Sequence, residues 1–248
     1  MSRRVHVVLG SPWKEAVIRH LEPRSPYRPW SHVAEVREND YVVVVFDTEP
    51  ALVLTEIGKI GSDLDVGSAI GRLRREWMFT DAVPVTQLGI ELPQGTIDGT
   101  AAADVVAAVR AQRFRAERED RFGTSPLAAA RVLLESGGSC TGCGAALPLK
   151  GPDARASVTV RTAEESPSDW PAALCPACRD AMHAGAFESF LDFKYFLHPQ
   201  CPQCGRRRSR RIAFGMPITP FDQPPWVDHR GCCVTDTWWV CSHCRHEW

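Results

Sequence analysis

The sequence lacks any apolar run long enough to cross a membrane. A transmembrane helix needs about 18 consecutive apolar residues, and no segment of the chain approaches that length. Residues 1–4 are basic, but the apolar stretch 5–9 that follows them is too short for the hydrophobic region of a signal peptide. We therefore expect a cytoplasmic protein with no membrane partner.

The chain also lacks an excess of either charge. Its 29 lysine and arginine residues nearly balance its 30 aspartate and glutamate residues, for a formal net charge of −1. Such a chain has no global field that attracts nucleic acid or a membrane, so any electrostatic recognition must come from a local cluster. The hydrophobic fraction of 44% and the length of 248 residues suit a soluble protein of two or three small domains.

Disulfides are not expected, because thiols stay reduced in the cytoplasm. The ten cysteines therefore need another explanation. Eight of them form Cys-x-x-Cys pairs, and such a pair presents two sulfurs from one tight turn to zinc, which prefers a tetrahedron of thiolates. The alternative is that some pairs are buried thiols or a redox dithiol. We predict two structural zinc ions, bound by Cys140, Cys143, Cys175 and Cys178 and by Cys201, Cys204, Cys241 and Cys244.

The cysteine pairs can be combined in two ways. Neighbouring pairs are separated by 31 residues in the first site and by 36 residues in the second. The nested alternative would join Cys175 and Cys178 to Cys201 and Cys204. We favour neighbouring pairs, because one long helix is predicted between the second and third pairs and would hold them apart by about 1.5 Å per residue.

The hydrophobic pattern predicts an α+β, multidomain chain. Residues 1–95 are expected to be mostly β, with strands at 5–9, 41–46 and 51–60 and short helices at 12–20 and 66–77. Residues 100–121 are predicted to be helical. A second helix begins with Ser125 as its cap and Pro126 in its first turn, and Gly137 and Gly138 end it.

The second half of the chain is organised around the cysteine pairs. Residues 151–171 are hairpin-like, with a strand at 156–161. The single long helix predicted after Cys178 has a broad apolar face formed by Phe187, Phe190, Leu191, Phe193 and Leu197. Cys232 and Cys233 lie in a β-rich stretch, and we interpret them as buried small hydrophobic residues rather than metal ligands.

Residues 139–144 (SCTGCG) and 174–179 (LCPACR) resemble the four-cysteine version of HNH endonucleases. The resemblance covers residues 140–184 and implies a treble-clef zinc module. The catalytic residues do not match, since the strand at 156–161 has no histidine, Trp170 stands near the expected asparagine, and Arg179 follows the last cysteine. His183 is the one candidate metal-binding histidine, whereas HNH chemistry needs both a general base and a divalent ion.

Residues 201–248 resemble a bacterial zinc-ribbon family. The matching segments are 201–205 (CPQCG), 215–217 (GMP), 232–234 (CCV) and 239–244 (WVCSHC). This resemblance implies a fold and a zinc ion, and no defined reaction.

The N-terminal region resembles a PUA-type barrel of the EVE or ASCH sort. The matching features are the early strand, Asn39 and Asp40 before the strand at 41–46, and residues 57–60 (IGKI). Such barrels read RNA or modified DNA bases, and some are fused to HNH nucleases in DNA restriction. The expected order is a PUA-like reader domain (1–95), a helical linker (96–138), an HNH-like treble clef (139–198) and a zinc ribbon (199–248).

Two groups of residues are candidates for nucleic-acid contacts. An arginine cluster beside the third cysteine pair would attract a phosphate backbone, and its binding would weaken with salt; the alternative is a solvated hairpin edge. Tryptophans in the N-terminal region could stack a base, although most tryptophans are core or rim residues. The candidates are Arg206, Arg207, Arg208, Arg210, Arg211, Trp30 and Trp77.

These features predict a zinc-dependent nucleic-acid-binding protein, with DNA favoured over RNA, that is related to HNH restriction-type proteins and has lost the nuclease site. One alternative is an active HNH-type, metal-dependent DNA endonuclease that uses His183 with Asp169 or Asp180. Another is a protein–protein adaptor, since zinc ribbons and treble clefs often only hold protein partners.

Overall fold

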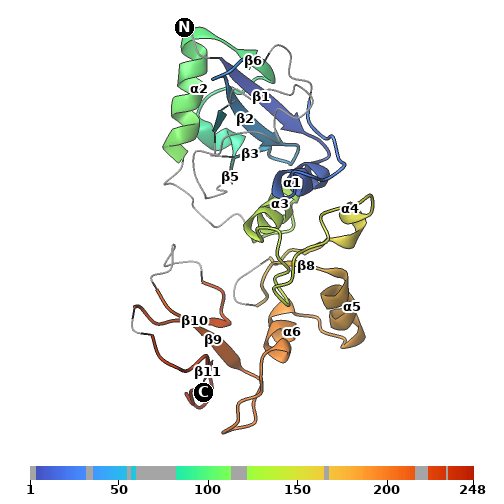
Figure 1. The fold of residues 1–248 in the computed structure, drawn as a ribbon, viewed down its shortest axis with the longest axis vertical. Coiled ribbons are helices and arrows are strands. Elements are labelled where there is room, and N and C mark those ends of the chain that lie inside the picture. The colour runs from blue at the N-terminus through green and yellow to red at the C-terminus, as the bar shows by residue number, and fades with distance from the viewer. Residues whose placement is uncertain are drawn as a thin grey trace. The chain divides into compact units, whose positions relative to one another are not determined.

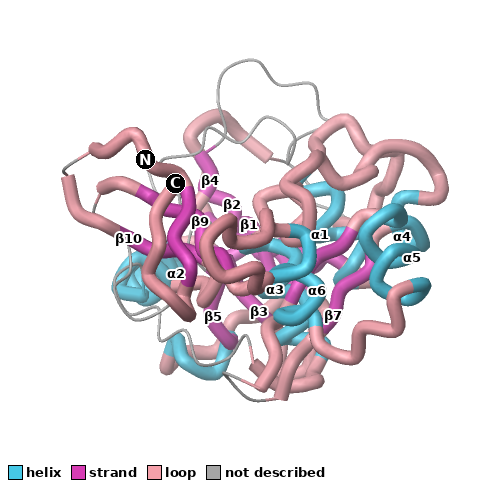
Figure 2. Tube along the Cα trace, turned by 90° about the horizontal axis from the view of Figure 1, so that it is seen from below, coloured by secondary structure: helices cyan, strands magenta, loops and turns pink. Residues whose placement is uncertain are grey.

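The computed structural model describes residues 4–31, 36–54, 57–59, 82–112, 122–164, 168–215, 223–232 and 234–248. The chain divides into two compact units. The first holds residues 1–164 and 171–176, and the second holds residues 165–170 and 177–248. Both units consist of short helices and strands joined by long loops (Figure 1, Figure 2).

A mixed sheet forms the centre of the first unit. β1 (Val5–Gly10) and β2 (Tyr41–Phe46) run parallel, from Val5 beside Tyr41 to Gly10 beside Phe46. The antiparallel strands are β3 (Leu52–Leu54), β4 (Gly58–Lys59), β5 (Ala82–Pro84) and β6 (Gly95–Ile97). The order is β5-β3-β2-β1-β6, with β4 also paired to β2. Among the described residues, β5 and β6 are the two edge strands of this sheet. They do not pair with each other, so the described part of the sheet does not close into the predicted barrel.

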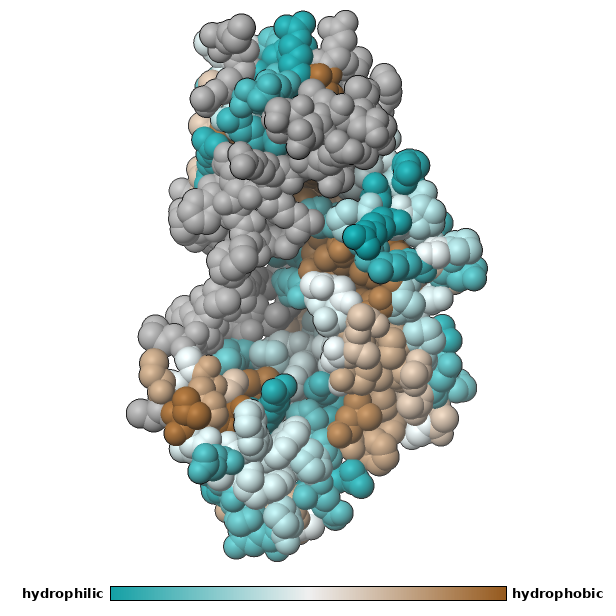
Figure 3. Space-filling model, in the orientation of Figure 1, coloured by the Kyte–Doolittle hydropathy of each residue, from teal (hydrophilic) through white to brown (hydrophobic). Residues whose placement is uncertain are grey.

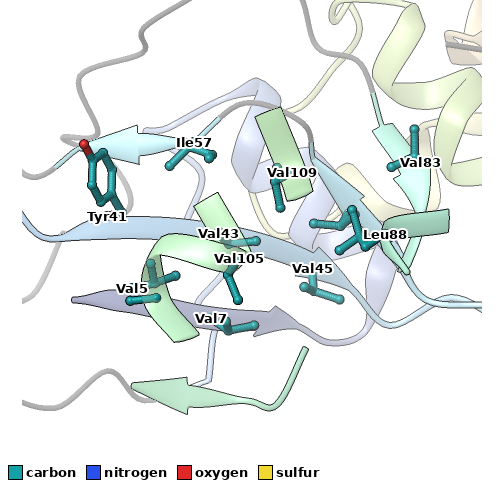
Figure 4. Packing of buried hydrophobic residues seen from close by; sticks show 12 residues of the cluster. Val5, Val7, Tyr41, Val43, Val45, Ile57, Val83, Leu88, Val105 and Val109 are labelled. Carbon is teal, nitrogen blue, oxygen red and sulfur yellow. The ribbon is translucent and has the colours of Figure 1, made fainter. Parts of the chain in front are cut away.

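The two faces of this sheet are covered by different helices. α2 (Gly99–Ala111) places Ala102, Val105 and Val109 on one side, at the spacing of a single helix face. These residues and Leu88, from the short 3-10 helix Val85–Leu88, pack with the valines of β1 and β2 in one buried cluster (Figure 4). α1 (Trp13–Leu21) connects β1 to β2 and lies on the opposite face, where Ala16 approaches Gly10 and His20 contacts the ring of Phe46.

The domain boundary predicted near residue 95 falls inside this unit. β6 pairs with β1, and α2 supplies one side of the core. Gly95, where the predicted domain ends, is the first residue of an edge strand. The predicted single strand at 51–60 is wrong in extent, because β3 and β4 are separate short strands on β2. The predicted helix at 66–77 and the end of the predicted helix at 100–121 lie outside the described residues.

A buried polar network fixes the amino end of the parallel pair. The His6 side chain is fully buried, with Nε2 2.8 Å from Asp40 Oδ2 and Nδ1 3.0 Å from Thr96 Oγ1. Arg4 and the Arg37 amide also donate to Asp40 Oδ2, each at 2.8 Å. Burial raises the pKa of Asp40, but the hydrogen bonds from His6, the Arg37 amide and Arg4 outweigh burial and hold this pKa below its usual value.

Residues 122–164 extend the first unit. α3 (Pro126–Glu135) begins as predicted, with Ser125 Oγ accepting a hydrogen bond from the Ala128 amide at 3.2 Å. α3 packs on α1, and its buried Arg131 donates to the Ala82 carbonyl at 2.7 Å. β7 (Thr159–Arg161) and β8 (Ala172–Leu174) form an antiparallel hairpin. The predicted strand at 156–161 is too long, because α4 (Ala154–Ser157) takes up its first two residues.

The single long helix predicted after Cys178 is also wrong. The segment forms α5 (Pro176–Ala184) and α6 (Phe190–Leu197). Ala186 takes a left-handed φ of 52°, and its amide bonds to the His183 carbonyl while the Phe187 amide bonds to the Met182 carbonyl. This pair of hydrogen bonds is the Schellman motif, which ends a helix. Ser189 then caps α6 by accepting hydrogen bonds from two amides of its first turn.

The rest of the second unit is a three-stranded sheet beside an aromatic core. β9 (Ser209–Ala213) lies between β10 (Val227–His229), which is parallel to it, and β11 (Trp239–Cys241), which is antiparallel. Trp226 meets Trp170 and Phe190 edge to face, with ring centroids 5.6 and 5.7 Å apart. Each such aromatic pair contributes about 0.5–1.5 kcal/mol to stability, in addition to the contribution of its buried apolar area.

Replacing Asp40 with asparagine should destabilise the first unit by on the order of 3 kcal/mol at neutral pH, because it leaves buried partners without their carboxylate. The folded pKa of Asp40 lies below the value of about 3.9 expected for an unfolded chain, so its stabilisation is present above that value and is lost as pH falls through the folded pKa. Thermal unfolding of both proteins between pH 7 and pH 2 should therefore converge at the acid end. A constant difference across that range would contradict this role.

Candidate metal centres

The structure brings the eight paired cysteines together in two groups of four. Cys140, Cys143, Cys175 and Cys178 form one group, and Cys201, Cys204, Cys241 and Cys244 form the other. In each group all sulfurs lie within 4.8 Å of one another. This is the neighbour pairing expected from the sequence, and the nested alternative is wrong. The preference was correct although the long helix used to argue for it is two shorter helices.

The distances between sulfurs fit a tetrahedral metal site. A zinc–sulfur bond of about 2.3 Å implies edges of about 3.8 Å in a regular tetrahedron. Cys143 and Cys175 are 3.9 Å apart, Cys201 and Cys244 are 3.6 Å apart, and Cys204 and Cys241 are 3.6 Å apart. A disulfide would require about 2.05 Å. Both groups could therefore hold a metal ion, and four thiolates are the donor set that zinc prefers.

Three of the four cysteine pairs share one backbone turn. The amide of the first cysteine donates to the carbonyl five residues later, at 2.7 Å for Cys140, 3.0 Å for Cys201 and 2.9 Å for Cys241. Its carbonyl accepts from the amide four residues later. That fourth residue has a positive φ in each turn: 78° at Gly144, 70° at Gly205 and 64° at Arg245. Glycine adopts this conformation without strain, which explains the Cys-x-x-Cys-Gly pattern of the first and third pairs.

The remaining pair, Cys175 and Cys178, lies at the start of α5. Thr141 connects it to the first pair, because its amide donates to the Ala173 carbonyl at 2.8 Å and its Oγ1 accepts from the Ala173 amide at 3.0 Å. The Cys175 amide also donates to Cys140 Sγ at 3.3 Å. The hairpin strand β8 thus positions Cys175 and Cys178 beside Cys140 and Cys143.

Hydrogen bonds and burial shift the pKa values of three of these thiols, Cys140, Cys241 and Cys244. Burial raises the pKa of Cys140 and of Cys241, but hydrogen bonds from amides and neighbouring thiols lower each to about 7. The His246 amide lowers the pKa of Cys244, but burial and three neighbouring sulfurs raise it to about 12. In the second group, Cys244 therefore loses its proton only against several nearby sulfurs. A divalent cation removes that repulsion, which is why metal binding and proton release are coupled.

The candidate catalytic residues do not form a second centre. His183 is exposed on α5, Asp180 pairs with Arg179 at 2.8 Å, and Asp169 Oδ1 accepts hydrogen bonds from Ser189 Oγ and the Leu191 amide. Asp169 therefore helps to hold the start of α6. Within the described ranges, the two cysteine groups are the only sets of three or more His, Cys, Asp or Glu side chains close enough to share a metal.

Of the two cysteines outside these groups, the structure describes only Cys232. Cys232 is exposed in a turn that follows β10, so its interpretation as a buried hydrophobic residue is wrong. The β-rich composition around it suggested a strand, whereas Gly231 has a φ of 49° and begins a turn. Cys233 lies outside the described residues.

The arginine cluster is partly engaged within the second unit. Arg207 lies 4.9 Å from the Phe196 ring and donates to the Phe196 carbonyl at 3.0 Å. Arg208 pairs with Asp192 at 3.1 Å, and Arg210 pairs with Asp228 at 2.8 Å. Arg206 and Arg211 are exposed, and no hydrogen bond or ion pair of their side chains is found among the described residues.

A second polar site lies where the parallel strands end. Gly10 and Phe46 are the last residues of β1 and β2, so Ser11 and Asp47 follow side by side, with Ser11 Oγ donating to Asp47 Oδ2 at 2.6 Å. Trp30 forms an isolated antiparallel β-bridge with Gly10, and the centroids of the Trp30 and Phe46 rings are 6.1 Å apart. The indole N–H is buried without a hydrogen-bond partner in the described part of the chain. We call Ser11, Asp47 and Trp30 the strand-end site.

The sequence predicted Trp30 but not Ser11 or Asp47. The available signal was that each polar residue directly follows an apolar strand. Parallel pairing was needed to bring the two together. Trp77, the other predicted aromatic residue, lies outside the described residues.

Comparisons with known proteins give no relative for this chain. No family model, no curated protein and no solved structure matches it. In the described parts of the chain, no helix has the length and apolar character needed to cross a membrane.

We expect two equivalents of metal per chain, with zinc the ion found in protein purified without added metal. Cys175→Ser and Cys241→Ser should each leave about one equivalent, because each removes a ligand from a different site. The measurement is elemental analysis after exhaustive dialysis. Binding should weaken as pH is lowered, since protonated thiols leave the metal. One equivalent or none in the wild-type protein would refute two sites.

The shared turn predicts opposite effects at two equivalent positions. Gly205→Ala should lower the stability of the second metal site by about 1–2 kcal/mol, because a side chain is disfavoured at positive φ. Its added methyl group would meet only the Gln200 side chain, at an ordinary 3.6 Å. Arg245→Gly should leave the stability unchanged or raise it by up to about 1 kcal/mol, since it relieves the same strain. Unfolding in increasing chelator measures both, and equal losses in the two variants would contradict the explanation.

Proposed function

We propose that this protein binds nucleic acid, with DNA favoured over RNA, through the strand-end site of its first unit, and that two structural zinc ions hold the cysteine modules in shape. The finer fold assignments belong to the same proposal. They are a PUA-like reader region, an HNH-like treble clef without a working nuclease site, and a C-terminal zinc ribbon. The order of the first module supports the treble clef: cysteine turn, hairpin β7–β8, then a cysteine pair at the start of α5.

The strand-end site is the observation that carries the proposal. Ligands of sheets with parallel strands bind beyond the carboxyl ends of those strands, where side chains from adjacent loops converge. Here that position holds an exposed carboxylate, a hydroxyl and a half-buried indole ring. Ser11 and Asp47 come from separate loops and meet because β1 and β2 are parallel and in register, and Trp30, from a third loop, contacts the last residues of both strands.

The chemistry of the strand-end site suits a nucleobase. Base stacking on an aromatic side chain contributes about 1–3 kcal/mol, and Trp30 is half-buried, so its ring is held in place but is not enclosed. The Asp47 carboxylate can accept a hydrogen bond from an exocyclic amino group, and the Ser11 hydroxyl can donate or accept. An extruded base would recover through these contacts a few kcal/mol lost on unstacking.

The arginines of the second unit supply a different contribution. Contacts between guanidinium groups and phosphates carry no base identity, so these arginines can add affinity and salt dependence but not sequence preference. Only Arg206 and Arg211 are exposed without an internal ion pair or hydrogen bond in the described residues. We therefore assign the backbone contribution of the cluster to these two residues first.

A protein partner is the second candidate function, and one observation favours it. Four large apolar side chains of the second unit are exposed. They are Phe196, Leu197, Val234 and Trp238, of which Val234 is 76% and Trp238 is 59% exposed. An adaptor would bind its partner through such residues and would bind no nucleic acid. The nuclease alternative has less support, because His183, Asp169 and Asp180 do not converge.

Binding of the full chain to labelled duplex DNA and to RNA, measured by fluorescence anisotropy, tests the proposal. Asp47→Ala should weaken binding about 10- to 150-fold, since a hydrogen bond to a charged group contributes about 1.5–3 kcal/mol. Asp104→Ala, which removes an exposed carboxylate on α2, is the matched control and should not weaken binding. Replacing Arg206 and Arg211 with glutamine should weaken all sequences alike and lower the salt slope by up to about two units.

The same experiment separates the competing functions. DNA recovered intact from reactions with magnesium or manganese argues for binding rather than cleavage. If the wild-type chain binds neither DNA nor RNA above background, the reader assignment fails and the adaptor function takes its place.

A further inference from the structure

Two segments far apart in the sequence lie side by side in the first unit. The loop that follows α1 contacts the segment around α4: Tyr27 Oη donates to the Pro152 carbonyl at 3.0 Å and accepts from the Arg155 amide at 3.1 Å. On α1 itself, Lys14 Nζ donates to the Val158 carbonyl at 2.7 Å. Hydrophilic side chains gather over α1 and α4 on the face shown in Figure 3.

The charge on this junction is strongly positive, although the chain as a whole is close to neutral. Three acidic residues face six basic ones, a surplus of three positive charges. The acidic residues are Glu15, Glu22 and Asp153. We define the basic surface as Lys14, Arg19, Arg24, Arg28, Lys150 and Arg155.

The ion pairs within the basic surface leave its outer cations available. Arg155 pairs with Glu15 at 2.7 Å and Lys150 with Glu22 at 3.7 Å, while the Arg155 and Lys150 side chains remain 59% and 70% exposed. Exposed pairs of this kind contribute about 0–1 kcal/mol, so a phosphate can compete for them or share them. Arg24 is exposed; its backbone amide bonds to Glu22, and no hydrogen bond or ion pair of its side chain is found in the part of the chain that the structure describes.

Arg28 is held by its own loop in a way that favours anion binding. Its Nη1 donates to the carbonyls of Ser25, Pro26 and Tyr27 at 3.3, 3.5 and 3.1 Å. A guanidinium has five N–H donors, and no hydrogen bond from Nε or Nη2 of this exposed side chain is found among the described residues. Little conformational entropy is lost when a side chain already held in this way meets a phosphate.

The cations of the basic surface lie close enough to repel one another. Burial lowers the pKa of Lys14, and Arg155 lowers it further. Burial likewise lowers the pKa of Arg19, and Arg28 adds to the effect. An anion bound to this surface would relieve that repulsion.

The basic surface begins beside the strand-end site. Arg28 precedes Trp30 by two residues, and the Ser11 amide donates to the Pro29 carbonyl at 2.9 Å. We propose that the basic surface binds the phosphate backbone of the nucleic-acid strand whose base enters the strand-end site. This inference rests on the proposed function and adds to it a second backbone contact, separate from the arginines of the second unit and joined to the strand-end site by the loop that holds Arg28 and Trp30.

The test is a double variant, Arg24→Gln with Lys150→Gln, in the full chain. A matched double variant, Arg37→Gln with Arg179→Gln, removes the same charge elsewhere. Arg37 is exposed before β2, at the opposite end of the parallel strands, and Arg179 is on α5. Binding to a labelled DNA duplex is measured from low salt to 0.3 M or higher, and thermal unfolding checks that both variants are folded.

The test variant should flatten the salt slope by up to about two units, because each lost phosphate contact removes about 0.9 unit. At a salt concentration of about 0.1 M this corresponds to a loss of as much as about 60-fold in affinity. The matched variant should keep the wild-type slope.

Each other result is also decisive. Suppose that the wild-type chain binds. If the test variant keeps the wild-type salt slope and affinity, or if the test and matched variants lose the same affinity, the basic surface does not contact the phosphate backbone, and the proposed function still stands. If the wild-type chain does not bind duplex DNA or RNA, the proposed function fails and this inference fails with it.

Discussion

The sulfur tetrahedra are the constraint on which the second half of the chain depends. The strands there are three to five residues long and the helices run to at most ten residues. Ordering each residue of such loop-rich segments costs about 1–2 kcal/mol in backbone entropy, and short elements recover little of that by burying apolar area. A structural metal contributes about 10–16 kcal/mol in small zinc peptides, which is enough to offset the part of the entropy cost that burial does not recover. Four thiolates within 4.8 Å of one another would repel strongly, and a bound cation would offset that repulsion.

The first unit depends on a different constraint, the alignment of two parallel strands. A hydrophobic pattern of alternate valines places α2 on one face and α1 on the other, but apolar packing alone tolerates sliding. His6 lies on β1, Asp40 directly precedes β2, and Thr96 lies on β6. The buried contacts of His6 with Asp40 and Thr96 therefore join these three segments at the amino end of the parallel pair. Buried polar groups are costly when unpaired, so this network favours one alignment strongly over its neighbours. The polar residues at the far end of the same strands acquire their positions from it.

The sequence predicted the features that are encoded locally. Each Cys-x-x-Cys pair, the strand β2 and the capped start of α3 depend on residues a few positions apart. The features it missed depend on context. The break between α5 and α6 occurs at Ala186, a residue with high helix propensity, because the Schellman hydrogen bonds and the Ser189 cap outweigh that propensity. The edge strand β6 has no apolar pattern of its own and is defined only by pairing with β1.

The same distinction applies to the candidate sites. Metal ligands could be found from spacing, because a Cys-x-x-Cys pair is a complete half-site. Ser11 and Asp47 are 36 positions apart and carry no motif, so their proximity follows only from the in-register pairing of Gly10 with Phe46. The arginine cluster looked uniform in the sequence, whereas folding gives Arg207, Arg208 and Arg210 internal partners that Arg206 and Arg211 lack among the described residues.

The parallel pairing of β1 and β2 also determines where this chain can change length over evolution. The crossover between the strands, which contains α1 and the loop after it, can gain or lose residues outside its helix at little entropic cost, since closure entropy grows only slowly with loop length. An insertion or deletion within either strand has a different effect, because one step of slippage turns every following side chain to the opposite face. It would turn the buried valines of that strand outward and separate the serine and aspartate at its end. Homologous chains should therefore differ in the length of the crossover while keeping six residues in each of these two strands.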